Sequence, residues 1–145
     1  MEQFREILRD WIDDTNLSLR QLEKISGVSA MQYSRYLRND TIPTIDVILK
    51  ICKFFQCSID YLFGLDTSKN SIRYKTYQYD LSKFIPRYLE LLKENNISHF
   101  KFAETQPFNE SILRHWQNGR TPRLDILYLI ANHFGSSIDY LIGRY

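Results

Sequence analysis

The side chains of residues 29–39 are of the types that bind DNA bases. Arg35 could donate two parallel hydrogen bonds to the O6 and N7 atoms of a guanine, and Gln32 could bond an adenine or a phosphate. Ala30 and Met31 could pack against thymine methyl groups. The stretch contains no Asp or Glu. These residue types predict contact with double-stranded DNA, and the alternative is a solvated helix face with no particular partner.

The residues before this stretch predict two helices that would position it. Apolar residues recur at i, i+3, i+4 and i+7 from residue 2 to about residue 14, a spacing typical of an amphipathic helix. Asn16 suits the exit from that helix. Ser18 is a plausible N-cap for a short second helix, which would direct Leu22 and Ile25 inward. The acids nearest in sequence to residues 29–39 are Glu23, on this second helix, and Asp40, directly after the stretch.

The following residues predict a tight turn and three more helices. Gly27 can take a positive φ angle at little cost. Ser29 would cap the third helix, which the run from Asn39 to Pro43 ends. A fourth helix is expected from Thr44 to Phe55, and a short fifth from Ser58 to about Phe63. The first unit is therefore predicted to be a small all-α domain.

Much of this pattern returns further along the chain. The run Arg35–Pro43 is echoed by Arg114–Pro122, and Ser58–Gly64 is echoed by Ser137–Gly143. The offset is 79 residues in both pairs. This period is too long for a solenoid repeat and suits two copies of a small domain. We therefore expect an all-α protein of two tandem five-helix domains.

The expected boundaries are residues 1–67 for the first domain, 68–80 for a linker and 81–145 for the second domain. The linker is polar at first and then mixes basic and aromatic residues. Over residues 72–75, apolar and basic residues alternate, a pattern that suits an extended backbone. It could touch a phosphate backbone or a partner, or pack its tyrosines on a neighbouring domain.

The second domain is predicted to follow the same plan. Ser98 would begin its second helix with Phe102 inward, and Asn109 would begin its third with Ile112 and Trp116 inward. A fourth helix is expected over 123–134 and a fifth over 137–142. The apolar stripe of its first helix would contain Leu81, Phe84, Ile85, Tyr88, Leu89 and Leu92.

Composition excludes several classes of function. The chain has 145 residues and a net charge of +2. Residues 1–68 carry 8 basic and 10 acidic side chains, net −2, while the rest carries 11 and 7, net +4. Any positive surface on the first domain must therefore be local. No apolar run is long enough to span a bilayer and no secretion signal is evident, so we expect a cytoplasmic protein.

Neither metal nor enzyme chemistry is expected. Cys52 and Cys57 are the only cysteines, and we expect them to be buried reduced thiols. His99, His115 and His133 have no neighbouring carboxylates or cysteines in sequence at metal-ligand or catalytic spacing. No glycine-rich phosphate loop or nucleophile motif occurs. We predict no enzymatic activity, no cofactor and no metal.

The run Leu17–Asn39, together with Pro43 and the ending Ser58–Gly64, resembles the Cro/repressor-type (XRE-family) helix-turn-helix domain. The resemblance covers the whole first unit. It implies five helices, with the third, the recognition helix, in the major groove of DNA. The candidate DNA-binding residues are Ser18, Ser29, Ala30, Met31, Gln32, Arg35, Arg38, Asn39 and Thr41. One departure is Leu19, where the family often has a Gln that binds a phosphate.

The second unit looks like a diverged copy of the same domain. Thr105–Asn109 replaces Ser26–Ser29, and Pro107 cannot take the positive φ that Gly27 permits. Glu110 would repel phosphate. The candidates for a second DNA-binding site are His99, Lys101, Asn109, Ser111, Arg114, Gln117, Asn118 and Arg120. Two alternatives stay open: an altered second DNA reader, or a helix-turn-helix frame reused for association.

The resemblance implies a sequence-specific transcription regulator, typically a repressor that occupies promoter DNA. Family members usually dimerise to bind two half-sites about one helical turn apart. A tandem chain could instead supply both halves and bind an asymmetric operator. The rival interpretation is a protein-interaction module, such as an antitoxin or regulatory adaptor, that binds a protein partner through its second unit.

Overall fold

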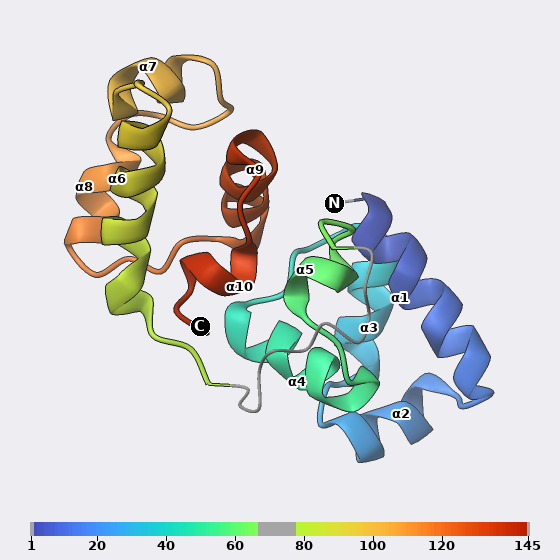
Figure 1. Cartoon of the computed structure of the whole chain (residues 1–145). Coiled ribbons are helices and arrows are strands. Elements are labelled where there is room, and N and C mark those ends of the chain that lie inside the picture. The colour runs from blue at the N-terminus through green and yellow to red at the C-terminus, as the bar shows by residue number, and fades with distance from the viewer. Residues whose placement is uncertain (1, 67–77, 145) are drawn as a thin grey trace. The chain divides into compact units, whose positions relative to one another are not determined.

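A computed structural model describes residues 2–66 and 78–144 of the chain, which divides into two compact units, Met1–Tyr77 and Gln78–Tyr145 (Figure 1). The described residues form helices and turns without strands, so the all-α class is confirmed. Residues 68–77 of the expected linker lie outside the described residues. Residues 78–80 belong to the second unit, where the Asp80 N–H donates to the carbonyl of Ile142 (2.8 Å). None of the described helices is both long and apolar enough to cross a membrane.

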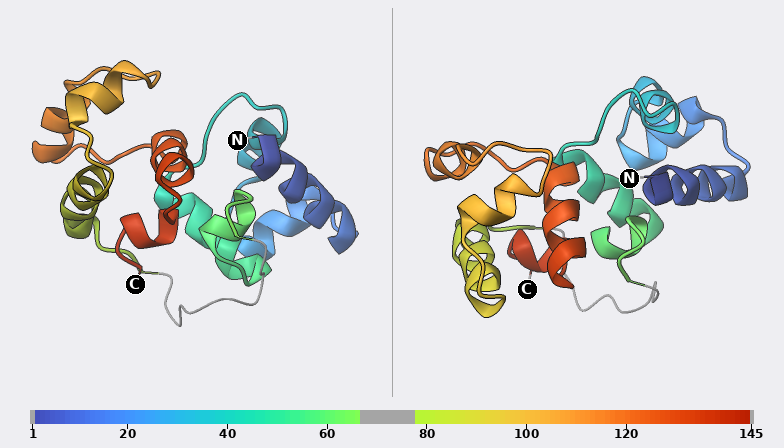
Figure 2. Two further views of the ribbon diagram at one scale, coloured as in Figure 1. Left: turned by 45° about the horizontal axis from the view of Figure 1, so that its top comes forward. Right: turned by 90° about the horizontal axis from the view of Figure 1, so that it is seen from above.

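The first unit contains five described helices that pack around one apolar core. They are α1 (Glu2–Thr15), α2 (Leu19–Ser26), α3 (Ala30–Leu37), α4 (Ile45–Phe55) and α5 (Ile59–Leu62). The core includes Leu8, Leu22, Ile48 and Ile59, each fully buried. α2 packs against α3 and α4, and α1 packs against α3 and α5 (Figures 1 and 2). Both expected thiols, Cys52 and Cys57, are buried, and neither forms a disulfide.

Polar side chains fix where these helices begin. Ser18, Ser29, Thr44 and Ser58 each adopt an extended conformation and accept a hydrogen bond from the backbone N–H three residues ahead. This contact satisfies one of the N–H groups that a helix N-terminus leaves without a partner. The N-caps predicted from the sequence are therefore confirmed.

The prediction for Ile25 was wrong. Ile25 was expected to point inward with Leu22, but its side chain is 60% exposed while Leu22 is fully buried. α2 is only eight residues long and contacts α3 and α4 through the stripe centred on Leu22. Ile25 lies at the edge of that stripe, one residue before the helix ends, and no neighbouring helix covers it.

The second unit contains a short 3₁₀ helix and five α-helices among its described residues. They are η1 (Leu81–Lys83), α6 (Phe84–Glu94), α7 (His99–Glu104), α8 (Ile112–Gln117), α9 (Leu124–Phe134) and α10 (Ile138–Leu141). Aromatic rings fill much of the core. The ring of Trp116 meets those of Phe84 (4.9 Å) and Tyr88 (5.6 Å) edge-on. Phe102 is fully buried and Ser98 caps α7, as the sequence predicted.

The apolar stripe of α6 differs from the predicted one. Leu89 is 42% exposed, whereas Leu91 and Leu92 are buried together with Phe84 and Tyr88. The buried residues keep the i, i+4, i+7, i+8 spacing of one helical face, and Leu89 lies about a quarter turn beyond Tyr88. Leu81, expected on the stripe, is only half-buried because it belongs to the 3₁₀ turn that precedes α6.

The hydrogen bonds at the ends of α3 and α8 correct the alignment of the two units. The N–H of Asp40 donates to the carbonyl of Arg35 (2.9 Å), and the N–H of Arg120 donates to the carbonyl of His115 (2.9 Å). This pattern pairs Arg35 with His115. The repeated sequence had instead indicated Arg114 as the counterpart of Arg35. The offset between the units is therefore 80 at this point and returns to 79 at Pro43 and Pro122.

The loop that follows α8 is accordingly one residue shorter than the loop that follows α3. Arg114 takes the place that Ser34 has on α3, and an imidazole, His115, takes the place of Arg35. The side chains that the two helices present to a ligand therefore differ more than the sequence repeat suggests.

A buried ion pair fastens the end of the second unit, and its loss provides a stability test. Arg144 donates to Asp139, and both side chains are fully buried. Arg144→Ala would leave the carboxylate of Asp139 without its cation, so we expect a loss of about 3–5 kcal/mol in the free energy of unfolding of this unit. Urea denaturation followed by the fluorescence of Trp116, in a chain with Trp11 replaced by Phe, measures the loss.

Arg123→Ala is the matched control, because Arg123 forms an exposed ion pair with Asp125 (3.2 Å). An exposed pair contributes at most about 1 kcal/mol. Equal effects of Arg144→Ala and Arg123→Ala would contradict a structural role for the buried pair.

Candidate nucleic-acid interface

The turn between α2 and α3 depends on a left-handed residue. Gly27 has φ 77° and its N–H donates to the carbonyl of Glu23 (3.0 Å). A Cβ atom at Gly27 would meet no atom within 4 Å. Glycine is therefore favoured at this position by the backbone angle and not by lack of space. The positive φ predicted for Gly27 is confirmed.

The hydroxyl of Ser26 joins α2 to α3. It donates to the carbonyl of Leu22 (2.8 Å), and it accepts from the hydroxyl of Tyr33 (2.7 Å) and from the N–H of Val28 (3.3 Å). Tyr33 and Val28 are fully buried. Burial raises the pKa of the Tyr33 phenol, so this donor keeps its proton at neutral pH. The Ser26 junction thus fixes the angle at which α3 leaves the turn.

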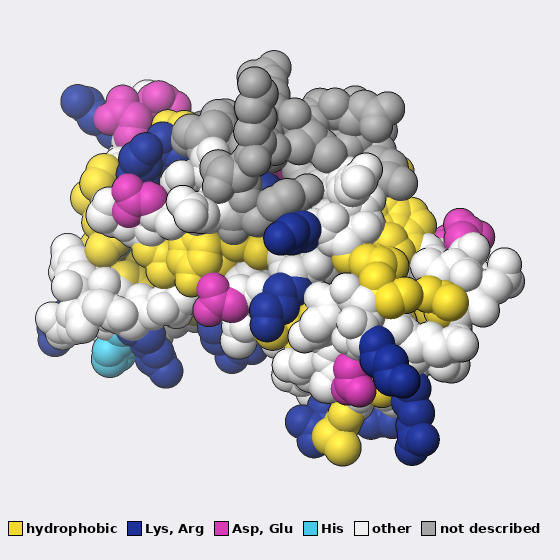
Figure 3. Space-filling view, turned by 90° about the horizontal axis from the view of Figure 1, so that it is seen from below, with side chains coloured by type: hydrophobic (Ala, Val, Ile, Leu, Met, Phe, Trp, Pro, Cys, Tyr) yellow, Lys and Arg dark blue, Asp and Glu magenta, His cyan; other side chains and the backbone are white. Residues whose placement is uncertain are grey.

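α3 buries one face and leaves the other open. Tyr33 and Tyr36 are buried, whereas Met31 is 65% exposed and Arg35 is exposed. The sequence-predicted site residues Arg38, Asn39 and Thr41 are also exposed, as is Ser18 at the start of α2, while Ser29, Ala30 and Gln32 are half-buried. Figure 3 shows Lys and Arg side chains gathered at its lower right, on the end of the first unit that carries α2 and α3.

The first turn of α3 is held by a reciprocal pair of bonds that limits what Gln32 can do. The Gln32 N–H donates to Ser29 Oγ (3.1 Å), and the Ser29 N–H donates to Gln32 Oε1 (3.1 Å). The amide oxygen of Gln32 is therefore occupied, while its NH₂ group can still donate. Such a group suits a phosphate oxygen or a base acceptor better than a two-bond contact to adenine. Ser18 forms the same pair of bonds with Gln21.

The two arginines near the C-terminal end of α3, Arg35 and Arg38, differ in their contacts. Arg38 donates from Nε to Asp40 Oδ2 (2.9 Å) and from Nη1 to Ser34 Oγ (3.0 Å). Within residues 2–66, the guanidinium of Arg35 forms no comparable hydrogen bond or ion pair. Arg35 therefore presents its full set of donors to an incoming ligand.

Two contacts that support α3 were not expected from the sequence. Glu23 Oε1 accepts from the N–H of Ala30 (3.0 Å), which places a carboxylate at the N-terminus of α3, where it favours the helix dipole. Arg9 on α1 donates to the carbonyl of Leu37 (3.0 Å) at the other end of the helix. The first contact crosses the turn between α2 and α3 and the second joins α1 to α3, so helix periodicity does not predict either of them.

The second unit builds the corresponding region without a left-handed turn. No residue between 105 and 111 has a positive φ. Ser111 precedes α8 in a helical conformation and makes no side-chain cap, while its N–H donates to Asn109 Oδ1 (2.9 Å). The expectation that this connection differs from the turn at Gly27 is confirmed.

His99 ties this region together. The Tyr88 hydroxyl lies 2.7 Å from His99 Nδ1, and His99 Nε2 lies 2.8 Å from the carbonyl oxygen of Glu110. Because a carbonyl only accepts, Nε2 carries the proton and Nδ1 accepts from Tyr88. Burial raises the pKa of the Tyr88 phenol, which keeps this donor protonated. Both ring nitrogens of His99 are thus used inside the unit.

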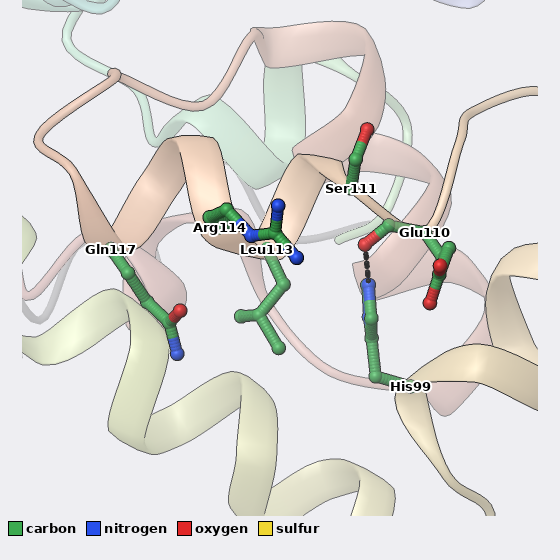
Figure 4. A pocket seen from close by; sticks show the side chains of 6 residues that line it. All are labelled: His99, Glu110, Ser111, Leu113, Arg114 and Gln117. Carbon is green, nitrogen blue, oxygen red and sulfur yellow. Dashed lines mark hydrogen bonds between the residues drawn. The ribbon is translucent and has the colours of Figure 1, made fainter.

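A small pocket of about 210 Å³ lies beside His99 and brings together several of the predicted second-site residues. Figure 4 shows Leu113, Arg114 and Gln117 projecting from α8, with the bond from His99 to the Glu110 carbonyl drawn as a dashed line. The pocket is lined by His99, Glu110, Ser111, Leu113, Arg114 and Gln117. The lining includes the carboxylate of Glu110, which would repel a phosphate.

The other predicted second-site residues lie outside this pocket. Lys101 on α7 forms an ion pair with Glu104 (3.6 Å). Asn118 and Arg120 are exposed after α8, and Asn109 is exposed in the turn before it. Among residues 2–66 and 78–144, no group of His, Cys, Asp and Glu side chains is arranged to hold a metal ion.

Comparison with known families gives a match within the first unit. A family model described as helix-turn-helix matches residues 8–62, a stretch that contains α2, the turn and α3. This match suggests a DNA-binding transcriptional regulator. Comparisons with curated proteins and with solved structures gave no match.

The hydrogen bond at Ser26 predicts that removing the hydroxyl of Tyr33 lowers the stability of the first unit more than removing the hydroxyl of Tyr36. Tyr33→Phe removes the bond from Tyr33 to Ser26 Oγ, so we expect a loss of about 1 kcal/mol in the free energy of unfolding of the first unit. Tyr36→Phe is the control, because no hydrogen bond of the Tyr36 hydroxyl occurs among the described residues. Urea denaturation followed by Trp11 fluorescence measures both. A larger loss for Tyr36→Phe would contradict the proposed junction.

Proposed function

We propose that this protein is a sequence-specific DNA-binding transcriptional regulator that inserts α3 into the major groove and represses by occupying promoter DNA. The observation that carries the proposal is the exposed face of α3, which contains no acid and presents at Arg35 a guanidinium that forms no hydrogen bond or ion pair with the described residues. The match of residues 8–62 to the helix-turn-helix family supports the same conclusion.

The side chains of the first unit divide into two kinds of contact. Arg35 is suited to a guanine, and Met31 and Ala30 are suited to thymine methyl groups. The half-occupied amide of Gln32 donates to a base or a phosphate. Ser18 at the N-terminus of α2, together with Arg38, Asn39 and Thr41 after α3, contacts the DNA backbone and sets the orientation of the domain.

Replacing the base-reading arginine tests this proposal. The full chain is used to select binding sites from a random DNA pool, and affinity for the best site is then measured. Arg35→Ala should weaken binding about 5- to 150-fold, equivalent to about 1–3 kcal/mol, and relax the preference at one base pair. Arg5→Ala, at an ion-paired arginine on α1, is the control and should leave affinity nearly unchanged.

The wild-type affinity should also fall steeply as salt rises, because phosphate contacts release counterions. If the random pool yields no enriched sequence, or if Arg35→Ala binds the selected site as well as the wild-type chain, the proposal is rejected.

We further propose that the second unit is a diverged helix-turn-helix domain that extends the contact with DNA. Support comes from the end of α8, which repeats the hydrogen-bond pattern found at the end of α3, and from exposed Arg114, Gln117, Asn118 and Arg120 around it. Since α8 presents other side chains than α3, the two units would read different half-sites, and one chain would occupy an asymmetric operator.

A paired substitution in the second unit tests this extension. Arg114→Ala with Arg120→Ala should weaken binding to the selected site and shorten the footprint on one side, because the first unit alone would remain bound. Lys93→Ala, an exposed lysine in the last turn of α6, is the control. Footprinting and affinity measurements report both effects.

The alternative is that the second unit binds a protein, either a different partner or a second copy of the chain. Phe100 and Leu89 favour this alternative, since their side chains are 51% and 42% exposed. An unchanged footprint in the paired variant would support it and reject the second DNA contact. Sizing of the complex with DNA distinguishes one chain per site from a dimer.

A further inference from the structure

A groove on the first unit is not used by the proposed DNA contact. Its volume is about 440 Å³, and it lies between the end of α2 and the outer side of α4. The lining residues are Ile25, Ser26, Gly27, Lys50, Lys53 and Phe54. We call this the α2–α4 groove.

One wall of the α2–α4 groove is apolar and open to solvent. Ile25 is the aliphatic residue that the sequence placed in the core, yet it is 60% exposed. Phe54 is half-buried, and its ring is held edge-on against the ring of Phe55 (4.8 Å). The empty space above Gly27, where a Cβ would meet nothing within 4 Å, continues this opening. The wall could therefore take up a partner's apolar side chain without rearrangement.

The other wall is positively charged. Lys50 and Lys53 stand one helical turn apart on α4, and both are exposed. Neither lysine forms an ion pair with another described residue. No Asp or Glu from the part of the chain that the structure describes lines the groove. Its electrostatic complement is therefore a segment that carries negative charge around an apolar side chain.

The groove lies at the end of α2 that is remote from Ser18. Ser18 marks the end of α2 that faces the DNA backbone, while Ile25 and Ser26 lie at the opposite end of this eight-residue helix. At about 1.5 Å per residue, the two ends are roughly 12 Å apart. A segment held between Ile25 and the lysines of α4 would therefore leave Ser18 open to the DNA backbone.

We propose that the α2–α4 groove docks an acidic segment of a partner protein, with one Phe or Leu side chain against Ile25 and Phe54 and flanking carboxylates against Lys50 and Lys53. The protein would thereby recruit its partner while bound to DNA. This goes beyond the proposed function, because it assigns a second ligand to the first unit.

A defined peptide tests the proposal on the full chain in the absence of DNA. The probe is a synthetic 12-residue peptide with one central Phe among Asp and Glu residues, and the readout is the backbone amide spectrum of the ¹⁵N-labelled protein. We expect shifts concentrated at residues 25–27 and 50–54. Two control peptides, one with Asn and Gln for the acids and one with Ser for the Phe, should bind at least tenfold more weakly.

Two protein variants locate the contact. Ile25→Ser and Lys53→Glu alter exposed side chains, so the fold should survive, and each should weaken binding of the Phe peptide at least tenfold. Lys24→Glu, at an exposed lysine of α2 that does not line the groove, is the charge control and should weaken it less. Shifts spread over α3, or binding insensitive to Ile25→Ser, would overturn the proposal.

The same variants test whether the groove instead binds DNA or a second copy of the chain. If Lys53→Glu lowers affinity for the selected DNA site as much as Arg35→Ala does, the groove belongs to the DNA surface and the proposal is wrong. If Ile25→Ser converts a dimer into a monomer in sedimentation, the occupant is a second copy of the chain and the proposal is likewise wrong. Since peptide binding is measured without DNA, its failure leaves the regulator proposal intact.

Discussion

The hydroxyl of Ser26 is the contact on which the position of α3 depends. It donates a hydrogen bond to the carbonyl of Leu22 at the end of α2. It also accepts hydrogen bonds from the N–H of Val28 in the turn and from the buried hydroxyl of Tyr33 on α3. A polar junction inside an apolar core is stabilising only when each group has a partner, as here. Because α3 is anchored on this buried side, its opposite face is free to present Arg35 to a ligand.

The second unit positions α8 through contacts that differ from those that position α3. It has no left-handed residue between α7 and α8, and an imidazole, His99, bridges the Tyr88 hydroxyl to the backbone of Glu110. Large aromatic contacts around Trp116 then hold α8 against α6. The position of α8 is therefore set by ring packing and one histidine, and its exposed side chains differ from those of α3.

Local signals in the sequence were sufficient for much of the fold. Ser18, Ser29 and Gly27 act within a few residues of themselves, so capping and turn chemistry predicted their positions. The bond from Glu23 to the N-terminus of α3 and the exposure of Ile25 depend on how helices cross, which periodicity does not specify. The sequence aligned Arg35 with Arg114 because both runs contain an Asn and a Pro at equal spacing. The one-residue shift that pairs Arg35 with His115 in the structure was therefore not predicted.

Whether α3 enters the major groove is measured most directly by removing a single acceptor from the DNA. In the site selected by the full chain, each guanine is replaced in turn by 7-deazaguanine, which lacks the N7 acceptor of the major groove. We predict that one such replacement weakens binding by the wild-type chain severalfold and has no effect on binding by Arg35→Ala. Equal affinity of the wild-type chain for every modified site would contradict our account.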